Sequence, residues 1–312
     1  MNPLEQALTD YLSIRRSLGF RLHEVETRLR NFVGFLQAEG TSYITRELAL
    51  RWATKSKDVQ PSTWASRLGV VRRFTIWYSA TEPRTEIPPA GLLPHRYRRK
   101  PPYIYTKEEI EQLLRQTQQL LSPKGLRAHS YTTLFGLLVA TGMRLNEALN
   151  LDRPDVDLRL GILYIRRGKF GKSRYVPVHA TTVDALRKYA AVRDRVFPTL
   201  TTPAFFISEH GRRIGARMAE ETFANLSEQI GLRGPTPHRG RRCPRLQDMR
   251  HLFAACTLVH WYRRGIDVER ELPKLATYLG HVHMRHTYWY LEAVPELLQL
   301  ATNRLIQREV QP

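Results

Sequence analysis

The stretch from 82 to 102 divides this 312-residue chain, because it holds six prolines and no helical periodicity. Proline lacks the N–H that a helix interior needs and fixes its own backbone, so neither a helix nor a central strand continues through such a segment. The sequence therefore predicts two folded parts, 1–81 and 103–312, joined by a linker at 82–102. The basic run 95–100 in the linker is typical either of a segment that lies along a polyanion or of a solvated tether.

Apolar residues recur at helical spacing throughout the first part of the chain. Leu4, Leu8, Tyr11 and Leu12, for example, fall on one face of a helix. The predicted helices of this part are 3–18, 24–38, 45–54 and 61–79. Amphipathic helices of this length with polar connections predict a compact all-α domain.

The second part is predicted to be mainly helical, with a small antiparallel sheet. Thr106 and Glu109 have the spacing of a capping box, so a helix should begin there. Residues 162–166 and 174–178 alternate like paired strands, with 168–172 as the tip of their hairpin. The further expected helices are 130–141, a short one ending at 151, 181–196, 217–230, 246–263, 272–279 and 295–307. A further short strand is expected at 204–208.

The charge of the chain is strongly basic. Lys and Arg number 49 against 29 Asp and Glu, which gives a net charge of +20. Residues 1–100 hold 17 basic and 9 acidic residues, and 101–312 hold 32 and 20, so the parts carry +8 and +12. A charge spread in this way favours a partner that is a nucleic acid gripped along the whole chain. A merely basic protein, or one that binds anionic membranes, is the alternative.

Neither a membrane span nor a disulfide framework is expected. No apolar run approaches the length that crosses a bilayer, and the first residues lack the regions of a signal peptide. The cysteines are only Cys243 and Cys256, with no repeated spacing that suggests zinc. A cytoplasmic protein without a membrane partner is expected.

Two arginines are candidates for holding a phosphate. Transfer of a phosphodiester without a metal needs fixed cations on its non-bridging oxygens. Gly142 is predicted to end a helix, and Arg144 follows with Glu147 three residues on, the spacing at which a carboxylate braces an arginine. Arg250 lies near the start of another predicted helix, and Gln247 shares its face. Each motif alone is equally compatible with a surface salt bridge or an ordinary amphipathic helix.

Such a reaction also needs a proton donor and a nucleophile. Lys169 and Lys172, on the glycine-bearing hairpin tip, have the mobile ammonium that can protonate a leaving oxygen. His281 follows a glycine, and Tyr290 lies nine residues further on. His281, His283 and His286 leave open a metal site, although no acidic or cysteine ligand accompanies them.

These segments together resemble the tyrosine recombinase, or phage integrase, family. The shared elements, in order, are Thr-Gly-Met-Arg-Leu-Asn-Glu-Ala around Arg144, the Gly-Lys hairpin, Arg-His-Leu-Phe-Ala, Leu-Gly-His and a tyrosine nine residues later. The helical first part resembles the core-binding, SAM-like DNA-binding domain of that family. The resemblance thus implies a mainly α fold, with the small sheet in an α+β catalytic domain at 103–312, and double-stranded DNA as the partner.

The resemblance also implies roles for individual residues. Arg144 and Arg250 would clamp the scissile phosphate, and His281 would hydrogen-bond to it. Lys169 would be the general acid for the 5′-oxygen, with Lys172 as the less favoured candidate. These roles require neither a metal nor ATP, and no cofactor is expected.

The nucleophile implied by the family pattern is Tyr290. It would form a 3′-phosphotyrosyl intermediate and release a 5′-hydroxyl. A free tyrosine has a pKa of about 10, so the site must help to remove its proton. Tyr288 is the rival nucleophile, and Tyr290 is favoured by its spacing from His281.

One position departs from the family pattern, which usually has histidine where this chain has Gln247. Glutamine can donate a hydrogen bond but cannot take up and release a proton. The main expectation is a site-specific recombinase or integrase that acts in integration, excision, resolution or transposition. The alternatives are a non-catalytic DNA-binding partner of a recombinase and, further off, a type IB topoisomerase.

The tail after Tyr290 is predicted to form an amphipathic helix. Such a helix either packs on its own domain or, as in the family, docks on a neighbouring subunit. The resemblance therefore implies a homo- or hetero-tetramer on DNA, with this helix exchanged between subunits.

Overall fold

The protein is described from a computed structural model that covers residues 3–95, 102–166, 168, 171–234, 243–293, 296–300 and 302. The chain divides into two compact units, 1–100 and 101–312. The division falls near the end of the proline-rich segment, and the finer domain bounds expected from the sequence stay predictions. None of the helices in the described residues combines the length and apolar character that crossing a membrane requires.

The first unit is built from helices whose apolar faces meet in one core. They are α1 (Pro3–Ser17), α2 (His23–Ala38), α3 (Arg46–Thr54) and α4 (Pro61–Tyr78), each within two residues of its predicted bounds. Aromatic rings carry much of the packing: the Tyr11 ring contacts Phe74 edge-on, and Phe32 packs on Trp52. The Trp52 Nε1–H also donates to Asn31 Oδ1 at 2.9 Å, which satisfies the polar end of a mostly buried side chain.

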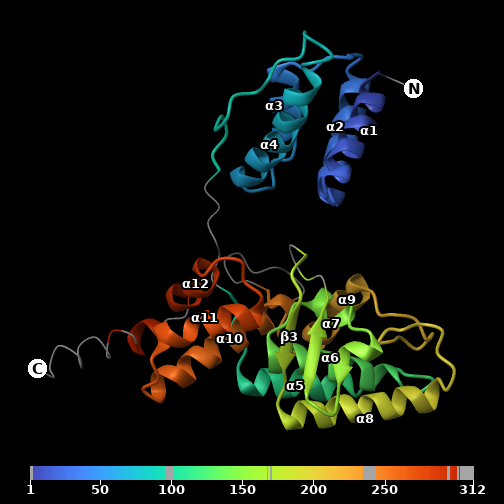
Figure 1. Ribbon diagram of the computed structural model, residues 1–312, viewed down its shortest axis with the longest axis vertical. Helices are drawn as coiled ribbons and strands as arrows, with labels where there is room; N and C mark the ends of the chain where they lie inside the picture. Colours follow the sequence, from blue (N-terminus) through green and yellow to red (C-terminus); the bar gives the residue numbers. More distant parts are fainter. Residues whose placement is uncertain are drawn as a thin grey trace, which may run out of the picture. The chain divides into compact units, whose positions relative to one another are not determined.

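The second unit combines helices with a small sheet (Figure 1). Its elements in chain order are α5 (Lys107–Thr117), α6 (Arg127–Thr141), α7 (Leu145–Leu149), η1 (Arg153–Asp155), β1 (Val156–Asp157), β2 (Ile162–Ile165), β3 (Arg174–Pro177), α8 (Ala180–Val196), α9 (Ala216–Gln229), α10 (Leu246–Arg263), α11 (Val268–Leu279) and α12 (Arg285–Ala293). Thr106 caps α5 with Glu109 in the predicted capping box. The fold class expected from the sequence is confirmed.

Helix α6 lies at the centre of the second unit and packs against α5, α7, α8 and α10. It is apolar on several faces, as a helix surrounded by neighbours should be. Its last residue is followed by Gly142, whose φ of +60° ends the helix in the left-handed conformation. A Cβ at Gly142 would also lie 2.7 Å from the Phe253 ring of α10, so glycine is required here twice over. Arg144 therefore emerges directly after a sharply fixed turn.

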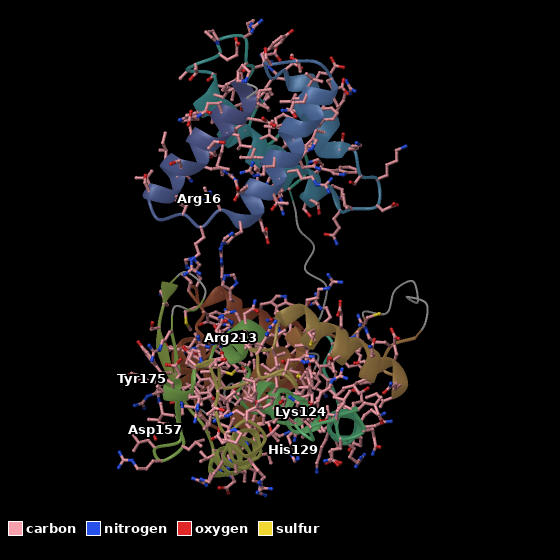
Figure 2. All side chains as sticks on the ribbon, turned by 90° about the vertical axis from the view of Figure 1, so that its right-hand side faces the viewer. Arg16, Lys124, His129, Asp157, Tyr175 and Arg213 are labelled. Carbon is pink, nitrogen blue, oxygen red and sulfur yellow. The ribbon has the colours of Figure 1, made fainter. Side chains whose placement is uncertain are left out.

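The sheet is antiparallel in the order β1-β2-β3, with Ile165 of β2 opposite Arg174 of β3. Side chains alternate along β3: Val176 is buried, whereas Tyr175 is 69% exposed on the outer face, where Figure 2 labels it. Arg174 and Val176 consequently point to the same, inner side of the sheet. The hairpin thus delivers Arg174 toward the helices.

The structure corrects some expectations about the elements. The strand predicted at 204–208 is wrong. The segment forms only isolated bridges, Asp152 with Ala204 and Ile207 with Arg213, because its backbone pairs with two different segments in turn and no continuous ladder develops. Helix α12 had not been predicted, and α11 begins at Val268 rather than at 272. Of the predicted tail helix, residues 296–300 and 302 are helical and the others lie outside the described residues.

Substituting Gly142→Ala should lower the free energy of unfolding by about 2 kcal/mol or more, because alanine is strained at positive φ and would clash with Phe253. Gly136→Ala is the matched control, since Gly136 lies inside α6 with open space around it. That change should be neutral or stabilising by up to about 1 kcal/mol. Urea unfolding followed by circular dichroism measures both, and equal effects would contradict the role of the turn.

Candidate active site

The end of α11 collects three arginines from different parts of the chain. Arg174 Nε donates to the carbonyl of Tyr278 at 2.8 Å, and Arg250 Nη2 donates to the carbonyl of Leu279 at 2.5 Å. Arg144 Nη2 reaches the carbonyl of Gly280 at 3.4 Å. The last carbonyls of a helix have no partner within the helix and carry its negative dipole end, so they suit cations.

Gly280 makes this convergence possible. It ends α11 in the left-handed conformation, with a φ of +68°. Its carbonyl comes next in the chain after the last carbonyls of the helix. A Cβ at this position would lie 2.7 Å from Nη1 of Arg174. The absence of a side chain therefore leaves the room that the guanidinium occupies.

Glu147 is the carboxylate that balances part of this charge. Its oxygens accept from both terminal nitrogens of Arg174, at 3.1 and 2.8 Å, and from Arg144 Nη1 at 2.7 Å. Burial acts to raise the pKa of Glu147, but the hydrogen bonds and charges of Arg174 and Arg144 outweigh it and lower this pKa to about 2. Glu147 thus braces Arg144, as its spacing had predicted, and is itself held by Arg174.

Arg250 is almost fully buried on α10. Besides the bond to Leu279, its Nη1 donates to the carbonyl of Gly142 at 2.9 Å, so it links the turn after α6 to the end of α11. Burial, and then the positive charge of Arg144, lower the pKa of Arg250 to about 10, while the charge of Tyr290 acts to raise it. A buried cation beside a second cation is short of negative charge, and a bound anion would supply it.

Tyr290 lies on α12 and is only 2% exposed. Its ring stacks on that of His281, with centroids 6.2 Å apart and planes 23° apart. His281 is fixed from two sides, since its Nδ1 lies 2.7 Å from Thr287 Oγ1 and its backbone N–H donates to Ala276. The structure thus brings Arg144, Arg250, His281 and Tyr290 around the end of α11.

The hydroxyl of Tyr290 lies 3.3 Å from Nδ1 of His251 on α10. The other ring nitrogen of His251 lies 3.9 Å from Oδ1 of Asp248. Asp248 is fully buried, and its other oxygen accepts from the backbone N–H of Arg245 at the start of α10. Burial raises the pKa of Asp248, against the lowering effect of Arg245.

The other predicted residues are exposed or lie outside the described residues. Gln247 is exposed on the first turn of α10, and within the described residues its side chain makes no hydrogen bond. Lys172 is exposed at the hairpin, where its carbonyl accepts from the N–H of Gly168 at 2.7 Å. Lys169 lies outside the described residues. Tyr288, the rival nucleophile, is 46% exposed.

The histidines of the Leu-Gly-His segment do not gather with other ligands. The His286 ring lies 6.0 Å from that of His281 and 6.1 Å from that of His283, measured between centroids. Across the part of the chain that the structure describes, no group of three or more His, Cys, Asp or Glu side chains could hold a metal ion.

Arg174 and His251 were missed as site residues by sequence reasoning. Arg174 is the first residue of the predicted strand 174–178, and its alternation with the apolar Val176 was the signal that assigns it to the inner face. His251 had been quoted only within Arg-His-Leu-Phe-Ala. Its position four residues after Gln247, hence on the same helical face, was the available signal.

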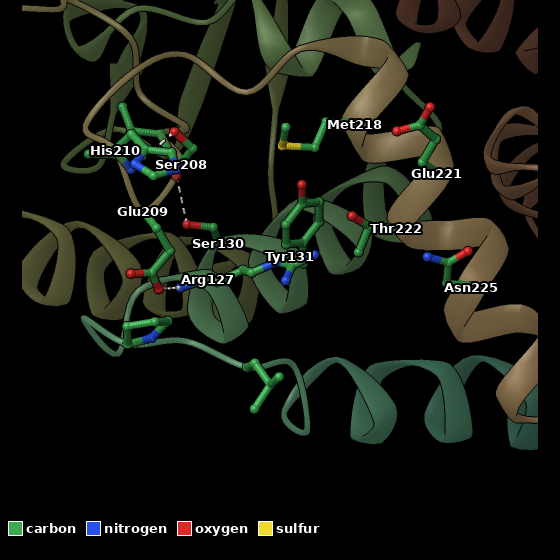
Figure 3. Close-up of a pocket in the computed structure, with 13 residues that line it drawn as sticks. Arg127, Ser130, Tyr131, Ser208, Glu209, His210, Met218, Glu221, Thr222 and Asn225 are labelled. Carbon is green, nitrogen blue, oxygen red and sulfur yellow. Dashed lines mark hydrogen bonds between the residues drawn. The ribbon is translucent and has the colours of Figure 1, made fainter.

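A pocket elsewhere in the second unit is separate from this cluster (Figure 3). It lies between the start of α6, the 207–210 segment and α9. There the Glu209 carboxylate accepts from the backbone N–H groups of Lys124, Leu126 and Arg127, so it caps the start of α6. None of the predicted site residues lines this pocket.

Comparison with known proteins decides the family. The sequence profile of the phage integrase family matches residues 104–296. The chain belongs to the phage integrase family. Its activity is that of a tyrosine recombinase, which cleaves and rejoins DNA strands.

Individual relatives agree with this membership. The protein y4rB of Sinorhizobium fredii is 48% identical, over 99% of this chain and 98% of y4rB. The tyrosine recombinase XerC of Herpetosiphon aurantiacus is 30% identical, over 92% of this chain and 89% of XerC. A post-cleavage complex of the XerH site-specific recombinase with palindromic difH substrate has a TM-score of 0.64 at 19% identity, covering 88% of this chain and 76% of that one. At this identity, the likeness to XerH shows the recombinase fold alone.

Substituting Glu147→Gln should lower the free energy of unfolding at pH 7 by about 3 kcal/mol, because it removes the charge that two arginines share. The stabilisation by Glu147 is complete above its ordinary pKa of 4.5 and is lost as the pH falls toward about 2. The difference between the variant and the parent should therefore shrink below pH 4.5. Urea unfolding at several pH values measures it.

Glu221→Gln is the matched control, since Glu221 pairs with Arg217 on the exposed surface of α9. It should change the free energy of unfolding by less than about 0.5 kcal/mol. A Glu147→Gln effect of that small size, or one that does not depend on pH, would show that Glu147 does not organise the arginines.

Proposed function

We propose that this chain recombines double-stranded DNA by attack of Tyr290 on a phosphodiester. The bond between the tyrosine oxygen and phosphorus forms as the bond from phosphorus to the 5′-oxygen breaks, which leaves a 3′-phosphotyrosyl link and a 5′-hydroxyl. The observation that carries the proposal is the setting of Arg250. This buried cation and Arg144 donate to the adjacent carbonyls of Leu279 and Gly280, and the next residue, His281, stacks on Tyr290, so a phosphate held between the arginines would lie near the nucleophile.

The charges of the arginine cluster support binding of a phosphate. Arg144, Arg174 and Arg250 carry three positive charges against the single negative charge of Glu147. Since Arg174 already uses all three of its nitrogens on Glu147 and the carbonyl of Tyr278, we assign the phosphate to Arg144 and Arg250. Positive charge already fixed in place stabilises the charge that develops on the phosphate without reorganisation. His281 is proposed to donate a hydrogen bond to the same phosphate.

The leaving 5′-oxygen needs a proton, which we assign to Lys169 at the hairpin tip, with Lys172 as the alternative. An ammonium on a glycine-bearing turn can follow the oxygen as the bond breaks. The hairpin is anchored at its base, because Arg174 of β3 is tied to Glu147. A proton donor carried on this hairpin would therefore be linked to the same carboxylate that braces Arg144.

The wider assembly is also part of the proposal. The first unit, whose net charge of +8 includes the basic run 95–100, would grip DNA together with the second unit. We propose a tetramer on DNA, with the tail helix after α12 exchanged between subunits. The cytoplasmic location and the choice between integration, excision, resolution and transposition stay predictions. Sequencing DNA covalently attached to the protein would identify the crossover site.

The Tyr290→Phe variant should form no covalent adduct with a nicked duplex that carries the crossover site, while its affinity for the intact duplex stays within about twofold. Phenylalanine keeps the buried ring and its packing on His281 but removes the attacking oxygen. Denaturing gel electrophoresis detects the adduct, and a filter-binding assay measures the affinity.

Tyr288→Phe is the control, since Tyr288 lies two residues away and is exposed. It should still form the adduct. An adduct that persists in Tyr290→Phe and disappears in Tyr288→Phe would assign the nucleophile to Tyr288. If the unsubstituted protein forms none, the chain is the non-catalytic partner of a recombinase.

Lys169→Ala should slow cleavage by about 100-fold or more, because general acid catalysis typically contributes 10²–10⁴-fold. A substrate with sulfur in place of the 5′-bridging oxygen should restore the rate, since a thiolate leaves without a proton. Lys172→Ala is the comparison, and a larger, sulfur-rescued loss in that variant would exchange the two roles.

A further inference from the structure

We infer that His251 is a further catalytic residue, the base that accepts the proton of the Tyr290 hydroxyl. The inference rests on the proposed role of Tyr290. Attack by Tyr290 requires a group that takes up its proton. Gln247 cannot be that group, because its side chain can donate a hydrogen bond but cannot take up a proton.

The contact between the two side chains has the form that proton transfer needs. Nδ1 of His251 lies 3.3 Å from the Tyr290 oxygen, slightly beyond the ideal distance and within the range found before substrate binds. In the tautomer with hydrogen on Nε2, Nδ1 accepts from the hydroxyl. The ring is held by Trp289, which packs edge-on against it at 5.4 Å between centroids.

The far side of the imidazole faces a carboxylate. Nε2 of His251 lies 3.9 Å from Oδ1 of Asp248, which is fully buried. A proton taken from Tyr290 makes the ring an imidazolium, and the carboxylate then stabilises the new charge where water is excluded. Asp248 cannot turn away easily, because its Oδ2 is bound to the N–H of Arg245.

The other groups around Tyr290 suit other roles. Nδ1 of His281 is engaged with Thr287, and its ring lies face to face with the phenol ring. Arg250 has no proton-accepting atom while it is charged. Gln247 and His251 are four residues apart on α10, so they share one face, with His251 one turn further along the helix.

Ionisable groups from several elements surround the pair formed by His251 and Tyr290. Asp248 on α10 and Tyr290 on α12 lie against His251 itself. Arg245 pairs with Asp248, the His281 ring stacks on Tyr290, and Arg250 lies within electrostatic reach of Tyr290. Burial, and then the charge of Asp248, raise the pKa of Tyr105, which precedes α5. The pH dependence of cleavage thus reports on this whole group and is best compared between variants.

The step balances as follows. The Tyr290 proton moves to Nδ1 of His251, and the freed electron pair forms the bond to phosphorus. The electrons of the broken bond go to the 5′-oxygen, which takes its proton from the hairpin lysine. Rejoining reverses the sequence, and the proton on His251 returns to the departing tyrosine oxygen.

The test is the rate of a single round of cleavage of the nicked crossover duplex between pH 5.5 and 10. In the unsubstituted protein the rate should rise with pH where an imidazole loses its proton, and then level off. His251→Asn places an amide nitrogen near the position of Nδ1 but cannot accept a proton. It should lower the rate at pH 7 by about 100-fold or more. The loss should shrink at high pH, where solvent removes the tyrosine proton directly.

His260→Gln is the matched control, because His260 is an exposed histidine on the same helix. It should keep the unsubstituted rate and pH profile. His251→Gln serves as a second variant if His251→Asn fails to fold, and circular dichroism checks the fold of both. The sulfur-substituted leaving group should rescue neither His251 variant, since it relieves the need for an acid and not for a base.

Three outcomes would overturn the inference. They are an unchanged profile in His251→Asn, a loss of equal size at every pH, which indicates a structural role, and rescue by the sulfur leaving group. Failure of the proposed function is distinguishable, because either the unsubstituted protein would then form no adduct or the adduct would persist in Tyr290→Phe, whatever the His251 variants do.

Discussion

The hydrogen bonds from Arg174, Arg250 and Arg144 to the carbonyls of residues 278, 279 and 280 are the contacts on which the site depends. Each arginine comes from a different element, so the end of α11 joins the sheet, α10 and the turn after α6. The carbonyls satisfy donors of the guanidinium groups without neutralising them, because a backbone oxygen carries only a partial charge. Positive charge is thus fixed in position while remaining available to an anion.

The carboxylate of Glu147 neutralises only part of the positive charge of the three arginines. Glu147 shares its oxygens between Arg174 and Arg144, whereas the hydrogen bonds of Arg250 within the described residues go to backbone carbonyls. A second acid beside Arg250 would relieve the repulsion from Arg144 that helps to lower its pKa, but it would also occupy the place that we propose for the phosphate. The repulsion between Arg144 and Arg250 therefore lowers the stability of the free protein, and binding of an anionic substrate would restore it.

The sequence was informative where the controlling interactions are local. Helical periodicity and the capping box at Thr106 predicted the helices, and the spacing of Gly142, Arg144 and Glu147 predicted the braced arginine. The ion pair between Arg174 and Glu147 could not be predicted in the same way. It joins residues that are 27 positions apart, and it depends on the register of a hairpin. The prediction of a strand at 204–208 failed although the signal was local. A short apolar run fits a buried segment with isolated bridges as well as it fits a strand.

The departure at Gln247 takes on a different meaning in the folded chain. From the sequence it indicated a missing base, because the matching position of the family usually holds histidine. In the structure this position is exposed on the first turn of α10, whereas the buried tyrosine hydroxyl faces the next turn of the same helix. The position of Tyr290 on α12 therefore decides which side chain of α10 lies next to its hydroxyl. The three-residue spacing between Gln247 and Arg250 does not decide it. Loss of histidine at one turn leaves the chemistry possible when the following turn carries an imidazole backed by a buried carboxylate.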